Sequence, residues 1–219
     1  MLVDDPAIGV LSAPNLTSGG RGAQLTDADW ERAVRHAVRR DGSPLLVMPG
    51  NEFNTLSDED LGAIVAYARS LPAQAKPAPT LKVGPVIRAM YVAGQVELAT
   101  AEEVEHARPH AASVAAEPTA AYGRYMATGC QGCHNPSYSG GKIPGTPPDW
   151  KPAANITPEG IGTWTEAQFI AALRTGRRPD GSAIDPQMPV KMTSQMTDTE
   201  LRAIYAYLRT VPAKPYGVR

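Results

Sequence analysis

Cys130-Gln131-Gly132-Cys133-His134 is the stretch that decides how this 219-residue chain is interpreted, and it contains both of its cysteines. Two cysteines three residues apart, with a histidine directly after the second, are the attachment signature of a c-type haem. The two thiols would add across the vinyl groups of the porphyrin, and His134 would lie below the ring and donate a nitrogen to the iron. The stretch therefore predicts a covalently bound haem and a role in redox chemistry.

Two other uses of a Cys-x-x-Cys pair fit this chain less well. A thioredoxin-like dithiol lies at a strand-to-helix junction in a βαβ context, and no such pattern is visible here. A structural zinc ion needs four ligands, and His106 and His110 would have to join the cysteines from a segment interrupted by Pro109. Cysteines with a purely structural role are the third alternative to the haem.

Composition narrows the class of protein. The chain has 21 basic and 22 acidic residues, which argues against a nucleic-acid partner because such a partner calls for a basic surface. No run of 18 or more apolar residues occurs, so no membrane span is predicted. The first six residues lack the basic start and apolar stretch of a secretory signal. Because covalent haem attachment normally happens outside the cytoplasm, we expect a periplasmic protein whose signal peptide is absent from the chain as given.

The chain also repeats itself at an offset of 139 to 140 residues. The matching segments are Asn15-Leu16-Thr17 with Asn155-Ile156-Thr157, Asp41-Gly42-Ser43 with Asp180-Gly181-Ser182, Met48-Pro49 with Met188-Pro189, and Ala63-Ile64-Val65-Ala66-Tyr67 with Ala203-Ile204-Tyr205-Ala206-Tyr207. Ordered agreement over about 60 residues indicates two similar domains.

The domain boundaries follow from this repeat. We expect an incomplete domain over residues 1–75, a proline-rich interdomain linker over 76–117 and a haem-binding domain over 118–219. The first copy lacks the front end on which the second carries its attachment segment. Either the chain as given starts late or the first domain is a degenerate remnant, and we favour the late start because the first copy keeps its Met-Pro pair and its terminal helix.

Helices can be placed from their caps and apolar spacing. Thr165 is expected to cap a helix that stops near Gly176, and Thr197 a helix that ends before Pro212. Ser57 is expected to cap the counterpart of the latter in the first copy. No strand pattern competes. The sequence thus predicts an all-α protein of two tandem domains built from short helices and long loops.

At this point the residues resemble a known family. The second copy resembles a class I cytochrome c domain, and the whole chain resembles the dihaem cytochrome c subunits of bacterial periplasmic dehydrogenases. The segments that carry the resemblance are Tyr122-Gly123-Arg124-Tyr125, Asn155-Ile156-Thr157, Leu173-Arg174-Thr175-Gly176, Met188-Pro189 and Ala206-Tyr207-Leu208-Arg209. In the first copy it begins only after the point where haem would attach. The resemblance implies that Gly123 allows a close crossing with the C-terminal helix.

The proximal iron ligand is predicted from its position. His134 follows Cys133 directly and should bind the iron. A ligating histidine usually donates its other N–H to an acceptor, and we expect this acceptor to be the carbonyl of Ile143 or Pro144.

Three methionines compete for the sixth position on the iron: Met188, Met192 and Met196. The repeat favours Met188, because it alone is matched by a methionine, Met48, in the first copy, and because Pro189 fixes the local backbone. The alternative is that Met188 fills space in a core. Met48 would be the equivalent ligand of a second haem, which is expected only if the missing N-terminal segment is present.

Three further residues are candidates for haem contact. The resemblance implies that Arg174 contacts a propionate, although a solvated role suits its helix equally. Trp164 either packs on the haem edge or fills core. Asn155 belongs to the family-like Asn-Ile-Thr motif, and we place it at the cofactor site with them.

These observations favour an electron carrier, not an enzyme in itself. The resemblance implies a cytochrome subunit or partner of a periplasmic dehydrogenase, with a dehydrogenase subunit as electron donor and a further protein as terminal acceptor. The alternative is a dihaem peroxidase-like redox enzyme, which would need an iron with an open site. A third hypothesis is a monohaem carrier whose first domain serves only for docking.

Overall fold

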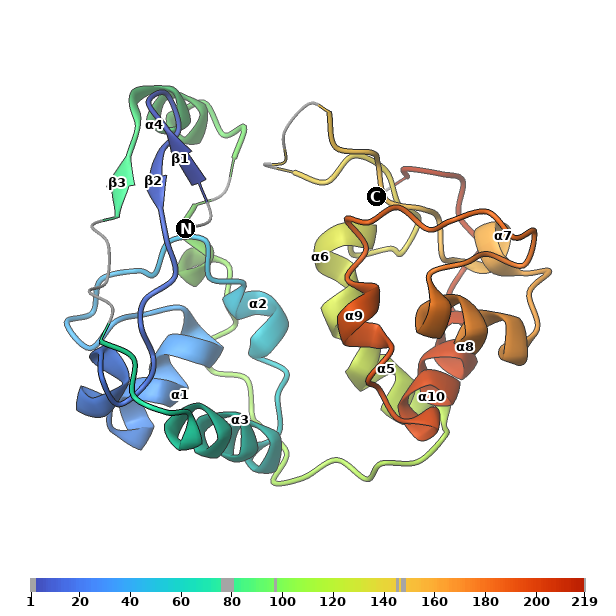
Figure 1. The fold of residues 1–219 in the computed structure, drawn as a ribbon, viewed down its shortest axis with the longest axis horizontal. Coiled ribbons are helices and arrows are strands. Elements are labelled where there is room, and N and C mark those ends of the chain that lie inside the picture. Colours follow the sequence, from blue (N-terminus) through green and yellow to red (C-terminus); the bar gives the residue numbers. More distant parts are fainter. Residues whose placement is uncertain (1–2, 76–80, 97, 145, 147–148, 219) are drawn as a thin grey trace. The chain divides into compact units, whose positions relative to one another are not determined.

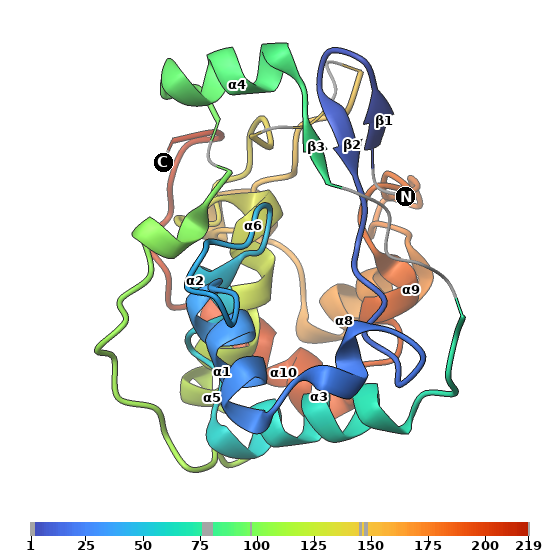
Figure 2. The ribbon, with the colours of Figure 1, turned by 90° about the vertical axis from the view of Figure 1, so that its left-hand side faces the viewer.

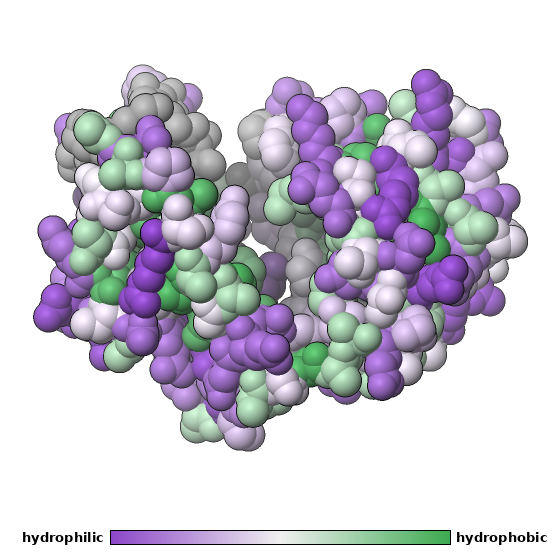
Figure 3. Space-filling view, turned by 60° about the horizontal axis from the view of Figure 1, so that its bottom comes forward, coloured by the Kyte–Doolittle hydropathy of each residue, from purple (hydrophilic) through white to green (hydrophobic). Residues whose placement is uncertain are grey.

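The computed structural model describes residues 3–75, 81–96, 98–144, 146 and 149–218. The chain divides into two compact units, Met1–Ser113 and Val114–Arg219, called unit 1 and unit 2 below. Both are mostly helical, as predicted (Figures 1 and 2). Hydrophilic side chains cover much of the face of each unit drawn in Figure 3. Among the described residues, no helix is long and apolar enough to cross a membrane.

Unit 2 is built on the crossing of two helices, α5 (Ala120–Ala127) and α10 (Asp198–Leu208). A Cβ on Gly123 would lie 1.8 Å from the carbonyl oxygen of Ala203, so only glycine lets the two backbones approach this closely. The face of α10 turned inward is apolar, with Leu201, Ala203, Ile204 and Leu208 buried. The crossing expected at Gly123 is confirmed.

The remaining helices of unit 2 complete a core beside this crossing. They are η3 (Thr128–Cys130), α6 (Gln131–His134), α7 (Pro158–Ile161), α8 (Glu166–Thr175) and α9 (Val190–Thr193). Helix α8 begins with a capping box between Thr165 and Gln168 and ends at Gly176, whose φ of 70° is left-handed. Its buried Phe169 belongs to a core cluster with Ala127, Tyr138, Ile161, Ile204 and Leu208. The helix bounds predicted from Thr165, Gly176 and Thr197 are confirmed.

Unit 1 repeats part of this arrangement. Its helices η1 (Arg21–Gln24), α1 (Asp27–His36), α2 (Gly50–Phe53) and α3 (Asp58–Ser70) surround a core of Trp30, Val34, Leu61 and Val65. By the repeat, α1, α2 and α3 correspond to α8, α9 and α10. Thr26 caps α1 with a capping box, as Thr165 caps α8, and Ser57 caps α3. Both first helices of the repeat end on a left-handed residue, but this residue is Ala37 (φ 52°) after α1 and Gly176 after α8.

The repeated Asn-x-Thr motif makes the same contacts in both units. In unit 2, Nδ2 of Asn155 donates to the carbonyl of Lys214 at 2.8 Å, and in unit 1, Nδ2 of Asn15 donates to that of Gln74 at 2.7 Å. Each Asn side chain also accepts a hydrogen bond from the threonine two residues later. The motif therefore ties the start of the repeated segment to the chain that follows its last helix.

The prediction of an all-α fold is wrong in one part of unit 1. Three short strands, β1 (Val3–Asp5), β2 (Gly9–Leu11) and β3 (Lys82–Val83), form an antiparallel sheet in the order β1-β2-β3. Strands of two or three residues are too short to show an alternating pattern, so periodicity cannot reveal them.

The segment expected to link two domains contributes structure to unit 1. It carries β3, the helix α4 (Pro85–Val92) and the 3₁₀ turn η2 (Thr100–Glu102), and unit 1 extends to Ser113. Residues 76–80, where the expected linker begins, lie outside the described residues.

Residues 98–112 of unit 1, called the strap below, run against the repeated core. The backbone N–H of Val47 donates to the carbonyl of Leu98 at 2.8 Å, and the hydroxyl of Thr100 donates to the carbonyl of Met48. At the other end of the strap, the N–H of Asp58 donates to the carbonyl of Ala111 at 2.9 Å. The strap thus connects the loop that carries Met48 with the start of α3.

We predict that Gly123→Ala lowers the free energy of unfolding by about 1–3 kcal/mol or more, because the added methyl group meets the backbone of α10. Gly62→Ala is the matched control. Gly62 also lies within a helix, but no atom comes within 4 Å of the position of its Cβ, so alanine should stabilise α3 by about 0.5–1 kcal/mol. Denaturant unfolding followed by circular dichroism measures both. Equal effects of the two substitutions would contradict the close crossing.

Candidate haem-binding site

The attachment segment forms a short helical turn after α5. Cys130 ends η3 and is partly buried, whereas Cys133 lies in α6 and is exposed. Residues three apart on a helix share a face, so the turn presents both sulfur atoms to the same side. His134, at the end of α6, is 8% exposed.

The orientation of His134 is set by one hydrogen bond. Its Nδ1 lies 2.7 Å from the carbonyl oxygen of Ala154. A carbonyl only accepts, so Nδ1 carries the proton and Nε2 keeps a lone pair for a metal. Burial lowers the pKa of His134, and the bond to Ala154 opposes that shift. The imidazole is therefore neutral near pH 7, which is the form that binds iron.

The acceptor expected for His134 is corrected here: it is Ala154, not Ile143 or Pro144. Backbone pairing between Gly141 and Ala153, at 2.9 Å in both directions, brings Ala154 under the imidazole. This pairing joins segments separated by a long loop, and nothing in the local sequence reveals it.

The loop after His134 is braced by a network of polar side chains. The amide of Asn135 donates to the carbonyl of Gly140 at 2.7 Å, and its oxygen accepts from the N–H of Ser137 at 2.8 Å. The hydroxyls of Ser137 and Ser139 both donate to the carbonyl of Val218, at 2.7 and 2.6 Å. The end of the described chain therefore supports the loop that pairs with Ala153.

A cavity of about 1050 Å³ opens beside His134. It is lined by Cys130, Cys133 and His134, by Met188, Met192 and Met196, and by Trp164 and Asn155 among others. Its volume lies just above the range of about 300–1,000 Å³ found for ligand sites, and most of the lining side chains named here are apolar. The two thiols, the neutral imidazole and an apolar cavity of this size fit a covalently attached haem.

The three candidate methionines differ in their surroundings, although all three line the cavity. Met192 is 71% exposed. Met196 packs against the core cluster of unit 2. Met188 is partly buried, and its N–H donates to the carbonyl of Asp185 at 3.0 Å directly before Pro189, the N-cap of α9.

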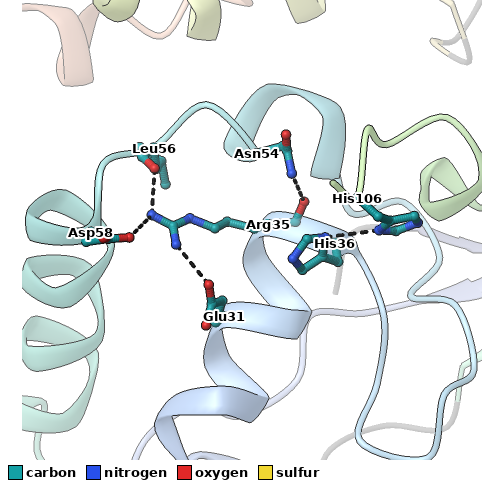
Figure 4. A network of polar contacts seen from close by, with 7 residues as sticks. All are labelled: Glu31, Arg35, His36, Asn54, Leu56, Asp58 and His106. Atoms are coloured by element: carbon teal, nitrogen blue, oxygen red, sulfur yellow. Dashed lines mark hydrogen bonds and ion pairs between the residues drawn. The ribbon is translucent and has the colours of Figure 1, made fainter. Parts of the chain in front are cut away.

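Arg174 is not among the residues that line the cavity. Its guanidinium donates to the carbonyl of Ser194 at 2.5 Å and forms an ion pair with Asp198 at 2.7 Å. Figure 4 shows the matching contacts in unit 1, where Arg35 bonds to the carbonyl of Leu56 and to Asp58. Arg35 thus links α1 to the start of α3, and Arg174 links α8 to the start of α10.

Two cations that sequence reasoning missed do line the cavity: Arg178 and Lys151. Arg178 also donates to the carbonyl of Ala183 at 2.7 Å, as Arg39 does to that of Pro44 in unit 1. The repeat could have drawn attention to Arg178, but its role in a turn is visible only in the structure. Lys151 is paired with Asp185 at 3.1 Å.

Met48 lies in a different setting from Met188. It packs against the core cluster of unit 1, and its carbonyl accepts from Thr100 of the strap. A haem ligated by Met48 stays a prediction.

The cytochrome c family model matches residues 120–212, the span that contains the attachment turn, Met188 and every residue that lines the cavity except Tyr216. This span is a cytochrome c domain. The domain runs from the start of α5 to beyond the end of α10, so the two helices that cross at Gly123 bound it.

Relatives match both the cytochrome c domain and unit 1. The chain is 29% identical to the fructose dehydrogenase cytochrome subunit of Gluconobacter japonicus, over 84% of this chain and 41% of the relative. It is 28% identical to the cytochrome c subunit of the alcohol dehydrogenase (quinone) of Gluconobacter oxydans, over 96% of this chain and 48% of the relative. It is 27% identical to the gluconate 2-dehydrogenase cytochrome c subunit of Pantoea cypripedii, over 94% of this chain and 52% of the relative. The chain spans about half the length of these relatives.

We predict that Gly140→Ala shifts the reduction potential of the haem-loaded protein and lowers the free energy of unfolding. Gly140 has a φ of 75°, and a Cβ there would lie 2.4 Å from the carbonyls of Ala153 and Ala154. The substitution therefore creates a clash with the segment that orients His134. It also strains the backbone by about 1–2 kcal/mol.

Gly181→Ala is the control for strain alone. Gly181 has a φ of 83°, and no atom lies within 4 Å of the position of its Cβ. It should cost a similar strain energy and leave the potential unchanged. Redox titration and denaturant unfolding separate the two effects, and an unchanged potential in Gly140→Ala would contradict the role given to this loop.

Proposed function

We propose that the chain carries electrons through a c-type haem bound by Cys130, Cys133, His134 and Met188. The observation that carries the proposal is the cavity in which both thiols, the oriented imidazole and the methionine loop meet. When bound, the haem supplies one-electron chemistry at its iron. Binding of the iron by the imidazole of His134 and the thioether of Met188 would raise the reduction potential and would leave no open position for oxygen or peroxide.

The choice of Met188 over its neighbours rests on the repeat and on local structure. Met188 and Met48 precede equivalent prolines, which cap α9 and α2 with closely similar dihedral angles. The capping proline therefore has the same backbone conformation in both units and directly follows a methionine in each, whereas Val47, which precedes Met48, has a left-handed φ of 61°. Met192 is largely exposed to solvent, and Met196 already contributes to the core.

The chain's other contributions are to hold the haem and to keep the iron site rigid. Trp164 lines the cavity and packs against the core cluster, so it would contact the ring and the helices together. Asn155 lines the cavity while its amide is fixed to Lys214. Arg178 and Lys151 are cations on the wall of the cavity and would neutralise the propionates, whereas Arg174 does not line the cavity.

We infer that the protein acts as the cytochrome subunit or partner of a periplasmic dehydrogenase. Its relatives are cytochrome subunits named for fructose, alcohol and gluconate dehydrogenases. A catalytic subunit would donate electrons to the haem, and a further redox protein would accept them.

Unit 1 is proposed to be a second cytochrome c-like domain. The equivalent caps, the Asn-x-Thr contacts and the arginine at the start of the last helix support this proposal. A relative of which the chain covers 35%, from Cereibacter sphaeroides, is named a diheme cytochrome c-type. A haem in unit 1 would use Met48, whereas the residues of this chain contain one attachment motif.

We predict that Met188→Ala abolishes the weak sulfur-to-iron absorption band at the red end of the oxidised spectrum and lowers the reduction potential. Met192→Ala, on the same loop, and Met48→Ala, in unit 1, are the matched controls and should keep the band. Loss of the band in Met192→Ala would reassign the ligand.

Intact mass and peroxide turnover test the wider proposal. We expect the mass of the matured chain to exceed that of the polypeptide by one haem. We also expect no rapid consumption of peroxide by the reduced protein, because His134 and Met188 would both bind the iron and leave peroxide no site on it. A colourless matured protein, or fast peroxide turnover, would contradict the electron-carrier function.

A further inference from the structure

Three of the chain's four histidines gather at the end of α1 in unit 1, away from any role in the haem site. His36 is the last residue of α1, and His106 and His110 belong to the strap. The ring centroids of His36 and His106 are 5.1 Å apart, and those of His36 and His110 are 6.4 Å apart. Figure 4 shows the rings of His36 and His106 facing one another.

The hydrogen bonds of this cluster fix the tautomers. Nε2 of His106 lies 2.9 Å from the carbonyl of Ala101, so this nitrogen carries the proton and Nδ1 has a lone pair. Nδ1 of His36 lies 3.0 Å from Nδ1 of His106 and must donate a hydrogen bond to it while His106 is neutral. Metal-ligating histidines usually donate one ring N–H to an acceptor such as a backbone carbonyl, and this bond orients the other nitrogen toward the metal. The carbonyl of Ala101 provides this support for His106.

We propose that His36 and His106 bind one divalent transition-metal ion through their Nδ1 atoms. Two nitrogens 3.0 Å apart, each about 2.0–2.1 Å from a metal, subtend an angle of about 90° at it. That angle suits adjacent positions of a square-planar or octahedral ion better than tetrahedral zinc, so the site favours Cu²⁺ and Ni²⁺.

The ion would take the place of the shared hydrogen bond. The proton on Nδ1 of His36 moves to Nε2 of the same ring, both rings turn so that their Nδ1 lone pairs point at the ion, and no proton is released. Burial lowers the pKa of His36, and the charges of His106, His110 and Arg35 act in the same direction against Glu31. His36 is therefore neutral, as a ligand must be, near pH 7.

The remaining coordination positions belong to water and to His110. Over the described part of the chain, no three His, Cys, Asp or Glu side chains already stand around one point that could hold a metal ion. Nε2 of His110, however, is buried and makes no hydrogen bond among the described residues. This nitrogen is the candidate for a third ligand, because a bond to the ion would give it the polar partner that it lacks.

Binding would have a structural consequence, because the ligands come from different segments. His36 ends α1, and His106 follows η2 in the strap. An ion bound to both joins them more firmly than a single hydrogen bond does. The same strap contacts Met48 and the start of α3, so the metal would stabilise unit 1 against unfolding.

Titration of the haem-loaded full chain with Ni²⁺ alone, followed by calorimetry, tests the proposal. In the loaded protein the haem occupies Cys130, Cys133 and His134. We expect one equivalent to bind near pH 7.5, Cu²⁺ to bind more tightly than Ni²⁺, and the affinity to fall at least tenfold in His36→Asn and in His106→Asn. His110→Asn should lower it by a smaller factor.

Glu159→Gln, at an exposed position of unit 2, is the control for binding to surface carboxylates and should bind as the parent does. Circular dichroism without metal verifies that each histidine variant is folded. In the parent, Ni²⁺ should broaden the ring-proton resonances of His36 and His106 first and raise the unfolding midpoint of unit 1. Unchanged affinity in the His36→Asn, His106→Asn double variant, or the absence of stoichiometric binding to the parent, would overturn the proposal.

Discussion

The imidazole of His134 is turned by a 2.7 Å hydrogen bond to the carbonyl of Ala154, and this bond joins parts of the chain 20 residues apart. It determines which ring nitrogen faces the cavity. The bond exists because Gly141 pairs with Ala153, and that pairing needs the close approach that a glycine at position 140 permits. Asn135, Ser137 and Ser139 hold the loop from the other side. The site is thus assembled from long-range backbone contacts around a short sequence motif.

The cavity lies beside this contact, and the helix crossing at Gly123 supports it. Met126 and Ala127, on α5, pack with Ile204 and Leu208 of α10 in the core that borders the cavity. Because protein interiors are close-packed, a shift of either helix would change the shape of the cavity wall. The crossing of α5 and α10 therefore affects both the stability of unit 2 and the shape of its cavity.

Much of this could be predicted from the sequence, and the reasons are local. Helix ends at Thr165, Gly176, Ser57 and Thr197 were predictable because a cap is a property of a few neighbouring residues. The place of His134 beside both cysteines in the cavity was predictable because the motif fixes its spacing, and its bond to iron stays a prediction. The repeat predicted equivalent structure in both units, and the contacts of Asn15 and Asn155 agree with it.

The rest depended on contacts between distant segments. The strands β1, β2 and β3 are too short to leave a pattern, and the pairing of Gly141 with Ala153 has no sequence signal. Arg174 resembled a propionate ligand, but its contact with Asp198 is made across the unit. The approach of His36 to His106 likewise requires the strap to fold back on α1, which spacing alone does not show.

Ala37 in unit 1 and Gly176 in unit 2 follow the matching helices α1 and α8, and each lies near the residue that begins the next helix, Gly50 or Val190. A Cβ on Gly50 would lie 2.8 Å from the Cβ of Ala37, whereas a Cβ on Gly176 would lie 3.6 Å from the side chain of Val190, which is ordinary van der Waals contact. The restriction on side-chain size therefore acts in unit 1 only. Exchange between the copies is one-sided: the valine of unit 2 would overlap Ala37 if it replaced Gly50, whereas the alanine of unit 1 would meet no overlap with Val190 if it replaced Gly176.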